Sequence, residues 1–257
     1  MPSRLKEVPN GLSDVGPPGD ELARFPMRFV TTVSLGDASG TVDPMPTNNG
    51  TMTLLQLPNR RVGVTCYHVI EAYREQRLMS PSREFKAGDH ALDPVDRLVS
   101  EDPILDLAVL DLDDVDPERL SAGSRELEFF EPAEWPLGTA EAGEPIALGG
   151  YPSFYRALSS DPDRDLGVFT LGTTCVIDVG IENIVCGLGW EYWIEGSGPR
   201  RMNAHADLGG LSGGPGFVWR GSEFHFVGVI FAVAQSRDYL RLRPARFIRR
   251  DATLWRV

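Results

Sequence analysis

Cysteine, histidine and long apolar runs are all scarce in this sequence. It has 3 cysteines and 4 histidines among 257 residues. Cys66, Cys175 and Cys186 are odd in number and lack metal-ligand spacing, so we expect neither a disulfide framework nor a metal site. No run of 18 apolar residues occurs, so we also expect no membrane partner.

Positive charge is in short supply as well. Lys and Arg total 25 against 37 Asp and Glu, which gives a net charge of −12. Such a chain repels polyanions unless it carries a compensating basic face. The one local excess of arginine, in residues 241–250, we interpret as the solvated side of a final helix. We therefore expect no nucleic-acid partner, and the absence of phosphate-loop and H-E-x-x-H motifs predicts no cofactor.

The first twenty residues lack the apolar core of a secretory signal peptide, which predicts a cytoplasmic chain. Residues 1–26 mix proline, glycine and charge without hydrophobic periodicity. This composition is typical of an extension or linker. The folded domain is expected to span residues 27–257.

Short apolar or alternating runs separated by turn residues are what the chain has in plenty. With 27 Gly and 20 Pro, the composition favours a turn-rich fold. Helical signals occur only in residues 69–77 and in the tail from Pro244. We expect an all-β fold in two units, residues 27–130 and 131–257, divided within the acidic segment 111–136. The predicted strands cover residues 29–35, 51–57, 62–66, 105–112, 145–148, 168–170 and 224–233.

Ser212 has glycines on both sides, in the segment GGLSGGP of residues 209–215. Glycine adopts backbone conformations closed to other residues and allows close approach to the chain. A hydrolytic serine needs both an exposed hydroxyl and nearby N–H groups directed at the developing oxyanion. Taken alone, the motif also fits a glycine-rich turn with an incidental serine.

A nucleophilic serine requires a base, and His68 is the best placed of the four histidines. An apolar run, residues 62–66, leads directly to it. His90 lies in a polar stretch, His225 in an alternating strand, and His205 too close in sequence to Ser212.

The base in turn needs an acid that fixes its tautomer, and Asp106 opens the apolar run of residues 106–110. Other acids nearby have more polar, turn-like surroundings and are expected on the surface. These are Asp102, Asp111, Asp113 and Asp114.

Three segments resemble the His, Asp and Ser motifs of trypsin-like serine peptidases. They are TCYHV (residues 65–69), ILDLAVL (104–110) and GGLSGGPGF (209–217). The closest similarity is to the disulfide-poor bacterial branch that includes the high-temperature-requirement proteases. The three residues occur in the family's order, separated by 106 − 68 = 38 and 212 − 106 = 106 positions. The resemblance covers about residues 28–257 and implies a double six-stranded β-barrel with a short C-terminal helix.

The resemblance also implies a role for each motif residue. Ser212 attacks the carbonyl, His68 acts as base and then as acid, and Asp106 orients His68. The N–H groups of Gly210 and Ser212 form the oxyanion hole. The residues implied in substrate binding are the strand Phe231, Ala232 and Val233, and Ala206 at the floor of the primary pocket.

Two features depart from the secreted digestive members of the family. Leu211 stands where they carry an activating Asp, and the usual disulfide beside the histidine is missing. The first departure implies that activation by a newly cleaved N-terminus is not used. The second agrees with a reducing compartment.

The sequence thus predicts a cytoplasmic, bacterial serine endopeptidase with protein or peptide substrates. We expect narrow specificity or activation by a protein partner. The G-x-S-x-G motif also fits an α/β-hydrolase. That fold needs an acid and a histidine after the serine, and only His225 follows, 13 positions on. A catalytically latent trypsin-like scaffold, acting as a binding or regulatory module, stays open as the alternative.

Overall fold

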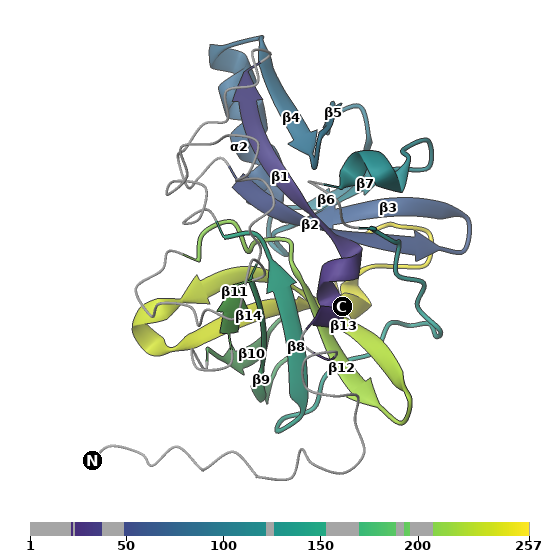
Figure 1. The fold of residues 1–257 in the computed structure, drawn as a ribbon, viewed down its shortest axis with the longest axis vertical. Helices are drawn as coiled ribbons and strands as arrows, with labels where there is room; N and C mark the ends of the chain where they lie inside the picture. The colour runs from purple at the N-terminus through teal and green to yellow at the C-terminus, as the bar shows by residue number, and fades with distance from the viewer. Residues whose placement is uncertain are drawn as a thin grey trace.

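Two antiparallel β units make up the protein and lie one above the other in the computed structural model (Figure 1). The structure describes residues 22, 24–37, 49–121, 126–152, 170–188, 193–195 and 208–256. All strands of the first unit fall within residues 30–111, and all strands of the second within residues 145–244. The expected all-β fold is confirmed. In the described part of the chain, no helix has the length and apolar character needed to cross a membrane.

The first unit is a seven-stranded sheet in the order β5-β4-β1-β2-β3-β7-β6. In the described residues it curls into a half-barrel, where the sequence predicted six strands in a closed barrel. Its strands are β1 (Val30–Asp37), β2 (Asn49–Leu57), β3 (Arg60–Thr65), β4 (Arg83–Ala87), β5 (His90–Leu92), β6 (Leu98–Asp102) and β7 (Leu107–Asp111).

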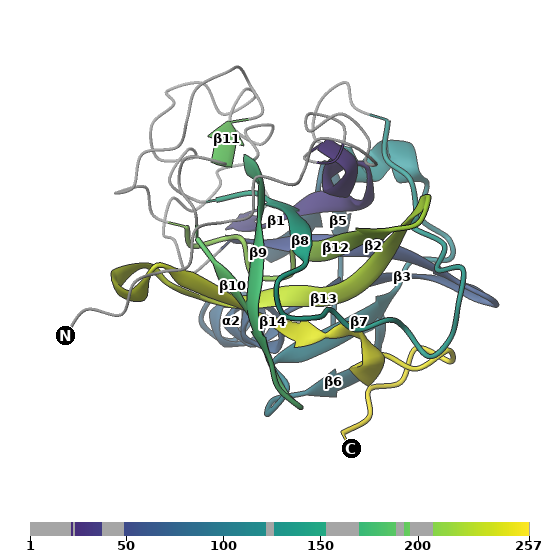
Figure 2. The ribbon, with the colours of Figure 1, turned by 90° about the horizontal axis from the view of Figure 1, so that it is seen from below.

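The second unit closes into a barrel of six strands, as predicted (Figure 2). The order is β10-β14-β13-β12-β8-β9, and β10 pairs again with β9 to complete the ring. A seventh strand, β11, extends the edge of β9. The strands are β8 (Pro145–Gly150), β9 (Thr170–Val179), β10 (Ile184–Gly187), β11 (Trp193–Glu195), β12 (Pro215–Arg220), β13 (Glu223–Ala234) and β14 (Tyr239–Pro244).

Helix α2 (Tyr67–Met79) contains the helical segment that the sequence predicted after β3. The expected C-terminal helix is wrong, because only the 3-10 turn η7 (Ala245–Phe247) forms there. Ala252 adopts a left-handed conformation, with φ of 70°, and the chain folds back so that Leu254 pairs with Ile248. The other 3-10 segments described are η1 (Phe25–Phe29), η3 (Pro117–Leu120) and η6 (Gln235–Arg237).

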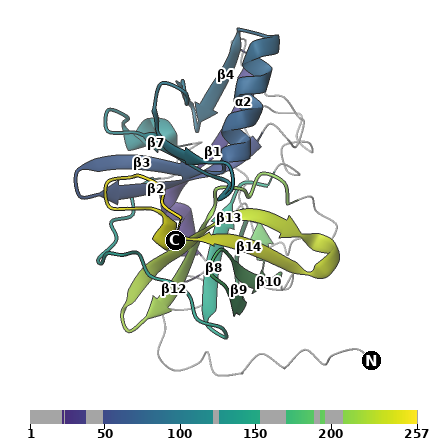
Figure 3. The same cartoon turned by 180° about the vertical axis from the view of Figure 1, so that it is seen from behind.

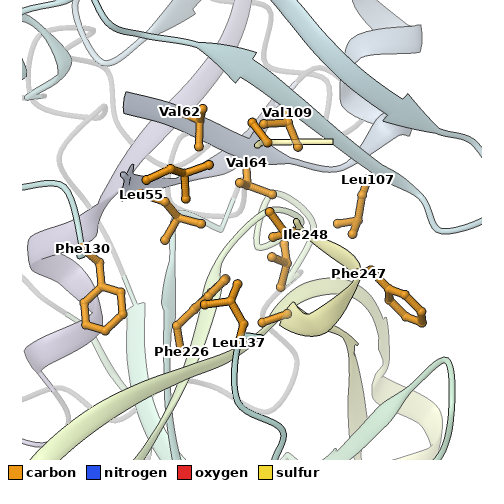
Figure 4. Packing of buried hydrophobic residues seen from close by; sticks show 14 of the residues in the cluster. Leu55, Val62, Val64, Leu107, Val109, Phe130, Leu137, Phe226, Phe247 and Ile248 are labelled. Carbon is orange, nitrogen blue, oxygen red and sulfur yellow. The ribbon is translucent and has the colours of Figure 1, made fainter. Parts of the chain in front are cut away.

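A hydrophobic cluster joins the two units (Figure 4). Side chains alternate along a strand, so Met52 and Leu54 of β2 point into the first unit while Leu55 and Leu57 point into this cluster. Thr51 and Thr53 share the strand face of Leu55 and Leu57 and therefore also face the second unit. Buried members of the cluster from the second unit include Phe217, Phe226, Val229, Phe247 and Ile248.

The packed structure begins before residue 27. Phe25 stacks on Phe224, with ring centroids 3.4 Å apart, and meets Phe217 edge to face at 5.2 Å. Pro26 is buried. The end of the segment that composition assigned to an extension therefore contributes aromatic contacts to the join between the units.

Candidate functional site

His68 and Asp106 form a hydrogen-bonded pair on the first unit. His68 lies in the first turn of α2, and its Nδ1 is 2.8 Å from Asp106 Oδ2. The other carboxylate oxygen, Oδ1, accepts from the His68 backbone N–H at 3.0 Å. Two contacts to one residue fix the carboxylate against the imidazole.

The second contact also completes the start of α2. The first N–H groups of a helix have no partner within the helix. Cys66, at the N-cap position, makes no side-chain capping bond, and Asp106 supplies an oxygen from across the sheet instead. One carboxylate thus caps the helix and holds the His68 ring.

Asp106 reaches this position through an uncommon backbone conformation. The run of residues 105–112, predicted as strand, starts pairing only at Leu107, and Asp106 ends the preceding turn with φ of 54°. Asp and Asn tolerate this region better than most residues do. Asp102, a rival candidate, is committed to the same turn, where its Oδ1 accepts from the N–H groups of Ile104 and Leu105.

The exposure of the pair suits proton transfer. The His68 side chain is 50% exposed and that of Asp106 is 21% exposed. Because Nδ1 bonds to Asp106, Nε2 is the ring nitrogen left to exchange a proton with another group.

Ser212 belongs to the second unit and reaches the pair beside Cys66. Its side chain lies near the Cys66 thiol and acts to lower the pKa of that thiol, against the larger effect of burial. The Cys66 sulfur lies within 4.8 Å of the ligand atoms of both His68 and Asp106. Ser212 and the pair of His68 and Asp106 therefore both lie beside Cys66.

Cys66 is buried at the centre of this group and sequence analysis assigned it no role. Its Sγ donates to Ile230 O at 3.3 Å. Burial raises the pKa of the thiol, and the charge of Asp106 raises it further. Cys66, His68 and Asp106 have the residue types of a metal site. A protonated thiol and an Nδ1 engaged by Asp106 fit a proton-transfer site better than a ligand set.

The loop that carries Ser212 contains two backbone donors that the described residues leave without an acceptor. Gly210 and Gly213 have φ of 90° and 98°, which favours glycine at both positions. Within the part of the chain that the structure describes, the N–H groups of Gly210 and Ser212 donate to no acceptor. These are the two donors that the sequence assigned to an oxyanion hole.

The first unit holds this loop through β2. Thr51 N–H donates to Ser212 O at 2.8 Å, and Thr51 Oγ1 to Gly210 O at 2.7 Å. Thr53 Oγ1 donates to Gly213 O at 2.7 Å. Sequence analysis missed both threonines, although their spacing of two in a strand signals a shared face.

Arg243 of β14 makes the reciprocal contact from the second unit to the first. Its guanidinium donates to the carbonyls of Ile104 and Leu105, which directly precede Asp106. It also donates to Asn183 Oδ1 and lies 4.1 Å from the centre of the Phe231 ring. Burial lowers the pKa of Arg243, and the charges of Glu182 and Asp106 act against this.

The sequence interpretation of residues 241–250 as a solvated basic face is wrong for Arg243, which is 8% exposed.

The predicted substrate strand lies beside the site. Figure 3 shows the hairpin of β13 and β14 below α2. Pairing of β13 with β12 ends at Val229, and Ile230 exchanges hydrogen bonds with Gly213 and Gly214. Beyond it, Phe231, Ala232 and Val233 are half-buried, and no described strand pairs with them on the β12 side. Ala206, the predicted pocket floor, lies outside the described residues.

Comparisons with known proteins give a fold-level likeness alone. No family model matches the sequence, and no curated protein matches it. Among solved structures, one match comes from work described as "Aromatic interactions drive the coupled folding and binding of the intrinsically disordered Sesbania mosaic virus VPg protein". The identity is 14% and the TM-score 0.43, over 85% of this chain and 87% of that one.

Proposed function

We propose that this protein is a serine endopeptidase of the trypsin-like kind, with Ser212 as nucleophile, His68 as general base and acid, and Asp106 as the acid that orients His68. The observation that carries the proposal is the two-point contact of Asp106 with His68, at 2.8 and 3.0 Å, beside the glycine-flanked Ser212. Fixing the Nδ1 proton leaves Nε2 free to act as a base.

The chemistry follows from these positions. Ser212 Oγ attacks the carbonyl carbon of a peptide bond and its proton passes to His68 Nε2. The carbonyl oxygen becomes an oxyanion that the N–H groups of Gly210 and Ser212 stabilise. Collapse breaks the C–N bond, His68 returns the proton to the amine, and water then cleaves the acyl-enzyme by the same steps.

The edge of β13 at residues 231–233, with which no described strand pairs on the β12 side, supports an extended peptide as the substrate. A peptide strand added to a sheet edge binds mainly through its backbone, which suits a hydrolase of peptide bonds. Narrow selectivity or activation by a protein partner belongs to the same proposal, which treats the site as a regulated endopeptidase of the bacterial cytoplasm.

A fluorophosphonate probe tests the proposal without knowledge of the substrate. Such a probe phosphonylates a serine that has an effective base and oxyanion donors. We expect folded wild-type protein to be labelled, and Ser212→Ala and His68→Ala not to be. His90→Ala is the control, since His90 lies on β5, away from the pair, and should label like wild type.

Two results count against the proposal. Labelling that survives in Ser212→Ala assigns the reaction to another nucleophile. Absence of labelling in folded wild-type protein supports instead the latent scaffold with a binding or regulatory role.

A further inference from the structure

Thr51 is buried completely at the boundary between the two units. It lies on β2, on the strand face directed at the second unit, opposite the loop of Ser212. Its backbone and side chain both contact this loop, at Ser212 O and Gly210 O. No other described residue of the first unit contacts both of these carbonyls.

The direction of the side-chain bond is determined by a third group. Tyr151 N–H, just after β8, lies 3.0 Å from Thr51 Oγ1 and can only donate. The hydroxyl oxygen therefore accepts from Tyr151, and the single hydroxyl proton is directed at Gly210 O. A buried hydroxyl with both functions used has one orientation.

The two carbonyls that Thr51 holds belong to the residues whose N–H groups are unpaired. Gly210 and Ser212 each present a carbonyl to Thr51 and an N–H that the described residues leave without an acceptor. Glycine at position 210 resists rotation of its peptide groups less than other residues do. Leu211 N–H donates to Leu208 O at 3.3 Å within the loop, and the Thr51 hydroxyl holds the same peptide group from outside the loop.

We infer that Thr51 is a positioning residue for the oxyanion hole, acting through its hydroxyl on Gly210. The inference rests on the proposed function and adds to it a residue on the opposite unit that touches neither substrate nor the reacting atoms. The bond from Thr51 Oγ1 fixes the plane of the peptide group between Gly210 and Leu211, between the two donors.

Thr53 offers a matched control on the same strand face. Its Oγ1 also donates to a carbonyl of the serine loop, that of Gly213, at the same distance of 2.7 Å. Gly213 follows Ser212 in the sequence, so its carbonyl does not lie between the N–H donors of Gly210 and Ser212. Replacing Thr53 by valine removes a comparable buried bond between the same two elements, so it measures the general cost of such a loss.

The test compares Thr51→Val, Thr51→Ser and Thr53→Val with wild type and Ser212→Ala. Acylation by p-nitrophenyl acetate and labelling by the fluorophosphonate are measured on folded protein, with thermal unfolding in parallel. We expect Thr51→Val to lower the acylation rate about 10- to 100-fold with little change in KM, below the loss caused by removing an oxyanion donor itself. Thr51→Ser keeps the hydroxyl and should stay within about threefold of wild type by the same reasoning.

Valine at position 51 removes both bonds of the Thr51 hydroxyl, with Tyr151 N–H and with Gly210 O, so a second pair of variants guards against misfolding. Thr51→Ala and Thr51→Ser differ by the hydroxyl alone, and we expect the alanine variant to be the slower of the two by about tenfold or more. Thr53→Val loses one buried bond where Thr51→Val loses two, so it should unfold at a somewhat higher temperature than Thr51→Val while acylating close to the wild-type rate.

The outcomes distinguish failure of the role inferred for Thr51 from failure of the proposed serine endopeptidase function. If wild type acylates and Ser212→Ala does not, but Thr51→Val matches Thr53→Val in rate, Thr51 is structural and the inference is wrong. If wild type itself does not acylate, the proposed function fails and the inference fails with it.

Discussion

The two units of this protein contribute different kinds of groups to the proposed site. The first unit supplies ionisable side chains, His68 and Asp106, held by a helix start and a turn. The second supplies Ser212, on a loop whose important groups are backbone N–H donors, and the edge of β13 with which no described strand pairs. Side-chain chemistry and backbone geometry are thus divided between two sheets.

Each unit makes hydrogen bonds to backbone carbonyls next to the site residues of the other unit. Thr51 of the first unit bonds the carbonyls of Gly210 and Ser212. Arg243 of the second unit bonds the carbonyls just before Asp106. Because each half of the proposed site is held partly by the other unit, we expect activity to depend on the interface between the units as much as on the motif residues.

Asp106→Asn tests the contribution of the first unit most directly. The amide keeps one oxygen for the His68 backbone but cannot accept the Nδ1 proton as a carboxylate does, so the ring loses its fixed tautomer. We expect the acylation rate to fall by about 10⁴-fold, with a free energy of unfolding within about 1 kcal/mol of wild type. Pre-steady-state acylation and urea unfolding measure the two effects.

Asp102→Asn provides the control for this prediction. Asp102 belongs to the same turn and pairs with Arg256 at 3.1 Å, but it does not contact His68. Its replacement should leave the rate within tenfold of wild type, on the order of a surface ion-pair effect. A rate for Asp106→Asn in that same range would contradict the division of roles between the units.

Gly213→Ala tests the backbone contribution of the second unit. Gly213 has φ of 98°, and a Cβ added there would overlap the Thr51 carbonyl. Strain and overlap together should cost about 3–4 kcal/mol in the free energy of unfolding, measured in urea. Gly221→Ala is the matched control, because Gly221 also has positive φ, 64°, but nothing lies within 4 Å of the added Cβ. Equal losses in the two variants would mean that close contact with β2 does not constrain the loop.

Arg243→Met tests the contact that runs from the second unit to the first. Methionine keeps apolar contact with Phe231 but leaves the buried Leu105 carbonyl without its donor. We expect a loss of about 2–3 kcal/mol in the free energy of unfolding and a rate lowered about tenfold through misplacement of Asp106. Arg243→Lys keeps the charge but not the forked donor set, and should fall between wild type and Met. A full rate in Arg243→Met would show that the turn of Asp106 holds without help from the second unit.

The sequence could single out the three motif residues as candidates because each lies in a short, recognisable segment, and their catalytic roles stay a prediction. His68, Asp106 and Ser212 each stand at the edge of an apolar or glycine-rich run. Thr51 was not predictable, because its partner Gly210 is 159 positions away and the contact depends on which face β2 turns toward the second unit. Arg243 was misread for a similar reason. Five arginines near the C-terminus suggest a solvated face, and only the pairing of β14 with β13 shows that Arg243 points inward.

Glu144→Gln should have the smallest effect, because this pair lies within one unit. Arg220 of β12 contacts Glu144 just before β8, with two donors at 2.7 Å. Burial raises the pKa of Glu144, but bonds from Arg220 and the Glu141 N–H outweigh it and lower the pKa overall. The ionised carboxylate therefore stabilises the fold above the unfolded pKa of about 4.3, and this is lost as pH falls through the lower, folded pKa. Both side chains of the pair are partly exposed. We therefore expect the free energy of unfolding of Glu144→Gln to be about 0.5–1 kcal/mol lower than that of wild type at pH 7. In urea unfolding, the difference should shrink as pH falls below the unfolded pKa and vanish below the folded pKa. Acylation at pH 7 should be unchanged, and a fall of tenfold or more would show that contacts within the second unit reach the site without crossing the join.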